Sequence, residues 1–132
     1  MDGVALTHLS ALLRVGIDVV GGTDPDSQAC TDFTTITGIM AYKTVGALLD
    51  TMPDLVTIAS PNRFHAQHLT ACLDAGVKYI WLEKPATTDP TVTLALAARA
   101  RAQGSRVMVG FQRRYMPSYQ NLKRDDLGAF VG

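Results

Sequence analysis

The chain has 132 residues, which is enough for one domain with a hydrophobic core, and its 47% hydrophobic and 18% charged residues are typical of globular proteins. The formal net charge is zero, so the composition gives no reason to expect a nucleic acid or a membrane surface as a partner. No apolar run approaches the roughly 18 residues of a membrane span, and no basic-then-apolar signal segment is present, so we expect a cytoplasmic protein. Cys30 and Cys72 lie far apart and form no Cys-x-x-Cys motif, which predicts reduced thiols and no metal site.

Apolar side chains recur at helical spacing near the start of the chain, which predicts an amphipathic helix over residues 3–14. The β-branched run from Ile17 to Val20 ends in two glycines and predicts the first strand, with a turn behind it at Thr23–Asp26. Residues 27–36 are rich in threonine and leave a short helix and irregular structure both open. We further expect a short strand at Ile39–Ala41 and a small helix around Val45–Leu49 that ends before Pro53.

The second half of the chain gives clearer signals. Leu55–Ala59 is almost entirely apolar, as expected for a strand that is covered on both faces. Thr88-Asp89-Pro90 has the cap and the first-turn proline of a long helix that runs to Gly104. The other expected elements are a helix over 64–75 with Gly76 at its C-terminal end, strands at Tyr79–Leu82 and Val107–Val109, and a helical stretch over 117–124.

Strands and helices thus alternate along the chain. This alternation predicts right-handed βαβ units and a doubly wound α/β fold, with a parallel sheet and helices on both of its faces. Such folds bind their ligands at the carboxyl ends of the strands. Polar residues that directly follow predicted strands are therefore the candidates for function.

Asp24 follows the first predicted strand. In dinucleotide-binding folds an acid at this place accepts hydrogen bonds from the adenosine ribose and repels a 2′-phosphate, which favours NAD over NADP. The alternative is that Asp24 only forms the Asp-Pro-Asp turn. Gly3 opens the first predicted helix, where a glycine lets a pyrophosphate approach the helix N-terminus, but a complete Gly-x-Gly-x-x-Gly motif is not present.

Ser60-Pro61-Asn62 follows the strand predicted at Leu55–Ala59 and precedes a helix. Its backbone N–H groups and small side chains are therefore expected to line a cofactor groove. His65 begins that helix, with His68 on nearly the same face. An exposed or helix-capping role is the simpler interpretation of each histidine. A metal site is not expected, because no cysteine or acid shares their spacing.

Glu83-Lys84-Pro85 follows the strand that ends at Leu82. A lysine held at a strand end can act as an acid, a base or a fixed positive charge, whereas a solvated Glu-Lys pair would contribute little. Gln112 and Arg113 follow the last strand in the same way. Two interpretations of this segment remain open: its side chains contact an anionic cofactor or substrate, or its arginines form an ordinary basic pair on the surface.

The order of these motifs resembles the Gfo/Idh/MocA oxidoreductases, which are NAD(P)-dependent enzymes that act on sugars, cyclitols and related compounds. The resemblance rests on Ser-Pro-Asn-x-x-His, Glu-Lys-Pro and Gly-Phe-Gln-Arg-Arg-Tyr-x-Pro, and it covers almost the whole chain. The last stretch is most similar to inositol 2-dehydrogenase-type members.

The resemblance implies NAD as the cofactor, with NADP less favoured, and a sugar or cyclitol substrate in relatives that are homo-oligomers. It implies that Asp24 holds the adenosine ribose and that Glu83 contacts the nicotinamide side of the cofactor. Lys84 would lie beside the nicotinamide and the reacting oxygen of the substrate, as the catalytic residue. The remaining cofactor-binding positions implied are Gly3, Ser60, Pro61, Asn62, His65, Gln112 and Arg113.

The chain departs from the family pattern at both ends. It begins inside the glycine motif, and it stops about where a C-terminal α/β substrate domain would begin. We therefore expect residues 1–132 to be a partial NAD(P)-binding Rossmann domain, without its first strand, without the substrate domain and without dehydrogenase activity of its own. The alternative is a non-catalytic nucleotide-binding or interaction module; a flavodoxin-like binder is disfavoured, because Glu-Lys-Pro has no role there.

The first strand of a Rossmann sheet is central, between the second strand and the fourth. Here its neighbours would be Ile17–Val20 and Leu55–Ala59. The chain would have to pair these segments directly, borrow a strand from a partner, or remain partly unfolded. We expect an unstable or aggregation-prone product, since open apolar edges invite pairing with other chains.

Overall fold

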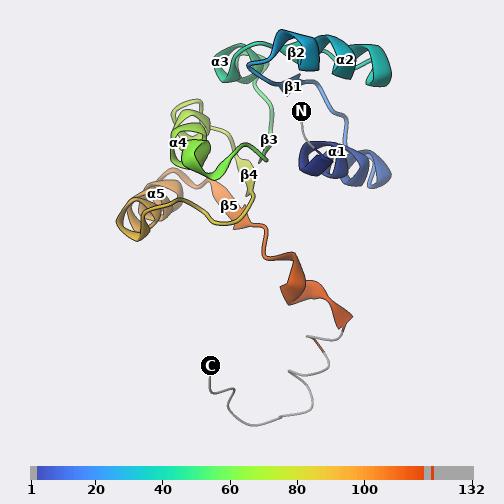
Figure 1. Ribbon diagram of the computed structural model, residues 1–132. Helices are drawn as coiled ribbons and strands as arrows, with labels where there is room; N and C mark the ends of the chain where they lie inside the picture. Colours follow the sequence, from blue (N-terminus) through green and yellow to red (C-terminus); the bar gives the residue numbers. More distant parts are fainter. Residues whose placement is uncertain (1–2, 118–119, 121–132) are drawn as a thin grey trace.

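The computed structural model describes residues 3–117 and residue 120, so the helical stretch expected over 117–124 lies mostly outside the described residues. Helices and strands alternate through this part of the chain (Figure 1). The helices are α1 (Gly3–Arg14), α2 (Ser27–Thr37), α3 (Val45–Leu49), α4 (His65–Asp74) and α5 (Pro90–Gln103), with short 3-10 turns at Asn62–Phe64 and Gln112–Tyr115. The strands are β1 (Gly22–Thr23), β2 (Ala41–Tyr42), β3 (Leu55–Ile58), β4 (Tyr79–Leu82) and β5 (Arg106–Val109).

All strand pairs in the described residues are parallel, but they form two separate sheets. The small sheet pairs β1 with β2, and the larger one has the order β3-β4-β5. The larger sheet is in regular register, with Leu55 opposite Tyr79 and Tyr79 opposite Arg106. Its strands are joined by α4 and α5, as the βαβ pattern predicted.

The hydrophobic core lies between the three-stranded sheet and the helices α4 and α5. Successive side chains of a strand point to opposite faces, so Ile80 and Leu82 enter this core, while Trp81 points to the other face and stacks on His8 of α1. Helices therefore cover both faces of the sheet (Figure 1). Cys72 is a core residue, as expected, and burial raises the pKa of its thiol to about 11.

The predicted helix ends are confirmed where local chemistry sets them. Asp89 caps α5 by accepting hydrogen bonds from the N–H groups of Thr91 and Val92, with Pro90 in the first turn. Gly104 ends the helix in the left-handed region, at φ +75°, where a residue without a Cβ is favoured. None of the described helices is long and apolar enough to cross a membrane.

The strand expected at Ile17–Val20 is wrong: only Gly22 and Thr23, just after it, pair with β2. Ile17 donates its N–H to Leu12 at the end of α1, and its side chain is exposed, as is that of Val20. A β-branched run becomes a strand only where a neighbouring strand pairs with it, and among the described residues β2 pairs only with Gly22 and Thr23.

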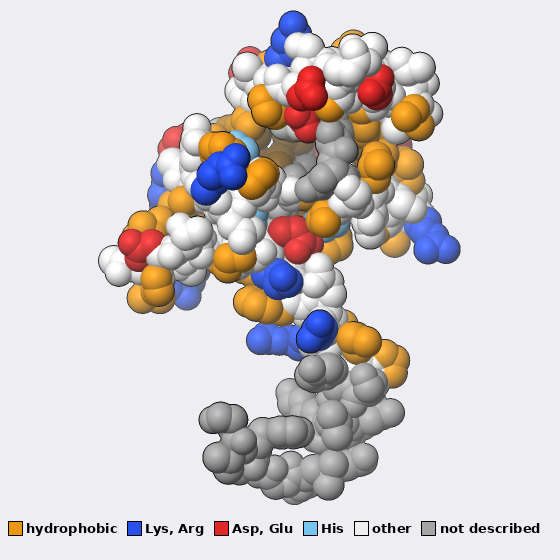
Figure 2. Space-filling view, viewed as in Figure 1, with side chains coloured by type: hydrophobic (Ala, Val, Ile, Leu, Met, Phe, Trp, Pro, Cys, Tyr) orange, Lys and Arg blue, Asp and Glu red, His pale blue; other side chains and the backbone are white. Residues whose placement is uncertain are grey.

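A cavity of about 1140 Å³ separates the two sheets. Its walls come from α1, from residues 17–26, from β3 and from side chains of α2, α3 and α4. The surface is hollowed in the same region in the space-filling view, between the part that holds α2 and α3 and the part that holds α4 (Figure 2). Ile17–Val20 and Leu55–Ala59 therefore do not pair directly with each other.

Candidate functional site

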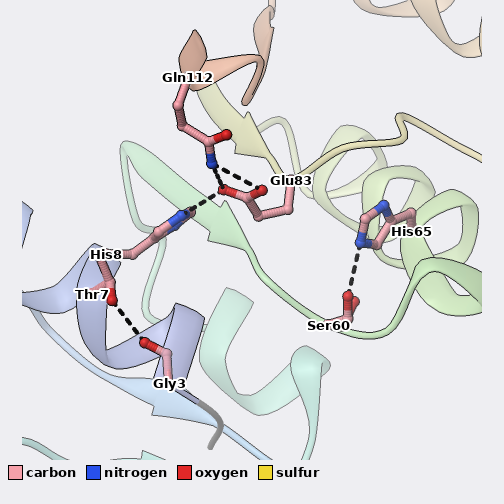
Figure 3. A network of polar contacts seen from close by, with 7 residues as sticks. All are labelled: Gly3, Thr7, His8, Ser60, His65, Glu83 and Gln112. Carbon is pink, nitrogen blue, oxygen red and sulfur yellow. Dashed lines mark hydrogen bonds and ion pairs between the residues drawn. The ribbon is translucent and has the colours of Figure 1, made fainter. Parts of the chain in front are cut away.

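The parallel order of β3, β4 and β5 brings the loops after these strands to one edge of the sheet. Glu83 follows β4, and its side chain is only 12% exposed. His8 Nε2 lies 2.8 Å from Glu83 Oε1, and Gln112 Nε2 donates to both carboxylate oxygens, at 3.1 and 3.3 Å (Figure 3). The carboxylate, which follows β4, is thus held by side chains from α1 and from the segment after β5.

Two further features fit this cluster of His8, Glu83 and Gln112 together. The His8 ring, only 4% exposed, stacks on Trp81 with the ring centres 4.3 Å apart. A Cβ added to Gly110 would lie 3.0 Å from Glu83 Oε1 and 3.2 Å from Trp81 Nε1. Glycine is therefore the residue that lets β5 end so close to the carboxylate.

The sequence pattern does not single out His8, because the leucines carry the apolar periodicity of the first helix. The signal that could have found it is a histidine beside Leu9 on the apolar side of an amphipathic helix. His8 Nδ1 and Trp81 Nε1 are buried and have no hydrogen-bond partner among the described residues. Buried polar atoms of this kind are usually satisfied by water or a bound group.

His65 joins two of the strand-end loops. Its side chain is fully buried; Nδ1 lies 2.6 Å from the Pro85 carbonyl and Nε2 lies 2.8 Å from the Ser60 carbonyl. The expected exposed or capping role is therefore wrong, because both ring nitrogens face backbone carbonyls inside the protein. His65 fixes the loop after β3 against the loop after β4.

His68 lies on the next turn of α4 and is half-buried. Its Nδ1 lies 2.9 Å from the Ser60 hydroxyl, and its ring stacks on Phe64. Burial lowers the pKa of His68, and the nearby His65 lowers it further. The two histidines together hold Ser60 by its carbonyl and its hydroxyl.

Asp24 lies directly after β1, at the strand end that the sequence predicted. Its Oδ1 accepts the N–H of Asp26 at 2.9 Å, which is the hydrogen bond that the turn-forming interpretation predicts. Asp24 also lines the large cavity, together with Ser60 and Pro61. Lys43, which follows β2, lines the same cavity and is a cation that the sequence did not place there.

The other predicted residues lie on the surface. Asn62, Lys84 and Arg113 are exposed at the edge where the three loops meet. Gly3 opens α1 as expected, but an added Cβ would meet nothing within 4 Å, so packing within the described chain does not require a glycine there. No group of three metal-binding side chains occurs in the part of the chain that the structure describes.

We predict that His8→Ala lowers the free energy of unfolding by about 1–3 kcal/mol, because the nearly buried Glu83 carboxylate loses a partner. Urea denaturation measures this, with Ser10→Ala as the control on the exposed side of the same helix. Equal stability of the two variants would show that the His8–Glu83 contact does not stabilise the fold.

We also predict that His68 makes the fold less stable in acid. Its pKa is lowered in the folded chain, so the fold favours the neutral ring; the stability present above about pH 6.5, the pKa of a free histidine, is lost as the pH falls below it. His68→Gln should therefore lose less stability than the unmodified chain between neutral pH and pH 5. Parallel urea titrations at the two pH values test this, and an identical loss in both proteins would contradict it.

The chain matches the family described as "Oxidoreductase family, NAD-binding Rossmann fold" (GFO_IDH_MocA) over residues 3–111. It is 36% identical over 91 residues to an inositol 2-dehydrogenase of Rhodococcus jostii, covering 65% of this chain and 25% of the relative. It is 32% identical over 123 residues to inositol 2-dehydrogenase 3 of Saccharopolyspora erythraea, covering 88% of this chain and 35% of the relative. The chain thus spans about a quarter to a third of these relatives.

Solved structures agree in fold. The WlbA (WbpB) dehydrogenase from Thermus thermophilus, in complex with NAD and UDP-GlcNAcA, superposes with a TM-score of 0.81 at 26% identity, over 94% of this chain and 43% of that one. The myo-inositol 2-dehydrogenase from Lactobacillus plantarum gives a TM-score of 0.83 at 22% identity, over 98% and 40%. The predicted Rossmann-type fold and the predicted cofactor, NAD, are confirmed.

Proposed function

Because the chain belongs to the Gfo/Idh/MocA oxidoreductase family, whose Rossmann fold binds NAD, we propose that it is the nucleotide-binding part of an NAD-dependent dehydrogenase. The substrate class is a sugar or a cyclitol, in keeping with the inositol 2-dehydrogenases that it resembles in sequence. The observation that carries the proposal is the carboxylate of Glu83, which His8 of α1 and Gln112 after β5 hold directly beside Lys84 at the carboxyl edge of the sheet.

The residues present fit the cofactor. Asp24 offers a carboxylate for ribose hydroxyl groups at the mouth of a cavity that Ser60 and Pro61 also line. Across the site, the unpartnered ring nitrogens of His8 and Trp81 lie buried beside Glu83, where a bound polar group would satisfy them. In this proposal Gly3 and Asn62 border the phosphates and the groove, and Gln112 and Arg113 lie near the nicotinamide.

NAD supplies the acceptor or donor of a hydride when it is bound. Lys84 holds a proton at the oxygen of the substrate, taking it as the alcohol is oxidised and returning it in the reverse direction. Glu83, fixed by His8 and Gln112, keeps the lysine's loop in one position. His65 also holds this loop in place, because its Nδ1 lies 2.6 Å from the carbonyl oxygen of Pro85.

A chimeric enzyme tests the proposal. Residues 3–111 would replace the matched segment of the Rhodococcus jostii inositol 2-dehydrogenase, which supplies the rest of an active protein. Turnover of a cyclitol with NAD⁺ is the expected result. Binding of NAD⁺ without turnover of any polyol would instead favour the non-catalytic nucleotide-binding module.

We predict that Lys84→Ala in this chimera lowers kcat by about 10²–10⁴-fold, the usual effect of removing a positioned acid–base group. The dissociation constant for NAD⁺ should change little. Lys78→Ala is the matched control, since Lys78 is exposed and precedes the same strand at its opposite end. An unchanged kcat would remove Lys84 from the mechanism.

We predict that the chimera binds NAD⁺ more tightly than NADP⁺, and that Asp24→Ser reduces this preference, because the substitution removes the carboxylate that repels a 2′-phosphate. Lys43→Ala is the companion variant, and it should weaken NADP⁺ binding more than NAD⁺ binding. Fluorescence titration of the three proteins with both cofactors gives the six dissociation constants. Tighter binding of NADP⁺ by the unmodified chimera would rule out the role of Asp24.

A further inference from the structure

The ring of His65 is fully buried, and both of its nitrogens face backbone carbonyl oxygens. Nδ1 lies 2.6 Å from the oxygen of Pro85, and Nε2 lies 2.8 Å from that of Ser60, the contact drawn in Figure 3. A carbonyl oxygen only accepts hydrogen bonds, and a neutral imidazole has one N–H and one bare nitrogen. A neutral His65 would therefore satisfy one carbonyl and point a lone pair at the other.

The two distances favour a ring that carries both protons. Hydrogen bonds from an uncharged N–H have an N···O distance of about 2.9–3.0 Å, and charge-assisted ones are shorter, at about 2.7–2.9 Å. The two contacts of His65 lie within or below the shorter range. An imidazolium has an N–H on each nitrogen, so it donates to both carbonyls at once.

Two effects oppose a positive charge at this place. A buried cation is costly when its N–H groups lack partners, but here each ring nitrogen has one. His65 also begins α4, and the dipole of a helix disfavours a cation at its first residue. That effect is modest, whereas a buried carbonyl that faces a lone pair loses a whole hydrogen bond. The balance favours the protonated ring.

The neighbouring His68 agrees with a charged His65. Burial lowers the pKa of His68, and the charge of His65 lowers it further, so His68 is the neutral member of the pair. A neutral ring can accept a hydrogen bond from the Ser60 hydroxyl, which lies 2.9 Å from its Nδ1. One histidine therefore carries the charge, and the other supplies a bare nitrogen beside it.

The two carbonyls that His65 joins belong to different halves of the proposed site. Ser60 lies after β3 and lines the cavity on the side assigned to the cofactor. Pro85 directly follows Lys84, the proposed acid–base group. The ring thus spans the space between the loop that borders the cofactor and the loop that carries the lysine.

We propose that His65 is a buried imidazolium and acts as a positioning residue, which holds the loop at Ser60 and the loop at Pro85 in one fixed relation. Its side chain is fully buried, so it acts on the reaction only through the two carbonyls. The effect on catalysis rests on the proposed function, whereas the number of protons on the ring does not depend on it.

Histidine-selective ¹⁵N labelling of the 132-residue chain counts the protons by NMR, and the sequence has only three histidines to distinguish. Near neutral pH we expect two protonated nitrogens on His65, and one protonated and one bare nitrogen on His68. The signals that disappear in the His65→Gln variant are those of His65. If the isolated chain does not fold, the same labelling of the chimera supplies the count. One bare nitrogen on His65 in the folded protein would overturn the proposal.

Two substitutions separate the two contacts. The amide nitrogen of asparagine can take the place of Nδ1, and that of glutamine the place of Nε2. His65→Asn therefore keeps the donor for Pro85, whereas His65→Gln keeps the donor for Ser60.

In the chimera we expect a crossed result. His65→Gln releases the lysine loop and should lower kcat about tenfold, with little change in the dissociation constant for NAD⁺. His65→Asn releases Ser60 and should weaken NAD⁺ binding about tenfold, with a smaller loss of kcat. Tenfold is the factor that one modest hydrogen bond provides. His68→Gln is the matched control, because His68 contacts Ser60 from the same helix, and it should leave two protons on His65.

Equal losses in the two His65 variants, or none in either, would show that His65 does not position the loops separately. A chimera that binds NAD⁺ but turns over no polyol would count against the proposed function alone, since the NAD⁺ dissociation constants and the proton count still decide the role of His65. If both variants fail to fold, the proton count in the unmodified protein decides.

Discussion

A nearly buried carboxylate at the end of β4 ties the candidate site together, because Glu83 is hydrogen-bonded to an imidazole on α1 and to an amide beyond β5. A carboxylate removed from water is stable only when donors surround it. This requirement fixes α1 and the end of β5 relative to β4, since a shift of either would leave the carboxylate short of a partner. Gly110 extends the constraint to the backbone, because any side chain there would enter the space of the carboxylate.

The loops beside this carboxylate are joined in a comparable way by His65, whose ring lies between the carbonyls of Ser60 and Pro85. The nicotinamide side of the proposed site is therefore braced within the three-stranded sheet, α1 and α4. Asp24, on the proposed ribose side, belongs to the other sheet.

Much of the fold could be predicted because its signals are local. Asp89, Pro90 and Gly104 mark the ends of α5 through hydrogen bonds and backbone angles within one or two turns. The apolar runs at Leu55 and Tyr79 became strands because neighbours pair with them as the alternation implied. The run at Ile17–Val20 has the same local character, but none of the described strands pairs with it, and it did not become a strand.

The sequence by itself determined the α/β class, the parallel βαβ units and the set of polar residues that follow the strands, because chain order alone sends those residues to one edge of a parallel sheet. Only the tertiary structure decided what these residues contact. It made His8 a partner of Glu83, turned His65 inward and left two sheets apart. The physical reason is that burial and hydrogen-bond partners are set by groups far away in the chain. His8 and Glu83 are 75 positions apart in the sequence, and a local sequence pattern cannot predict a contact between such distant residues.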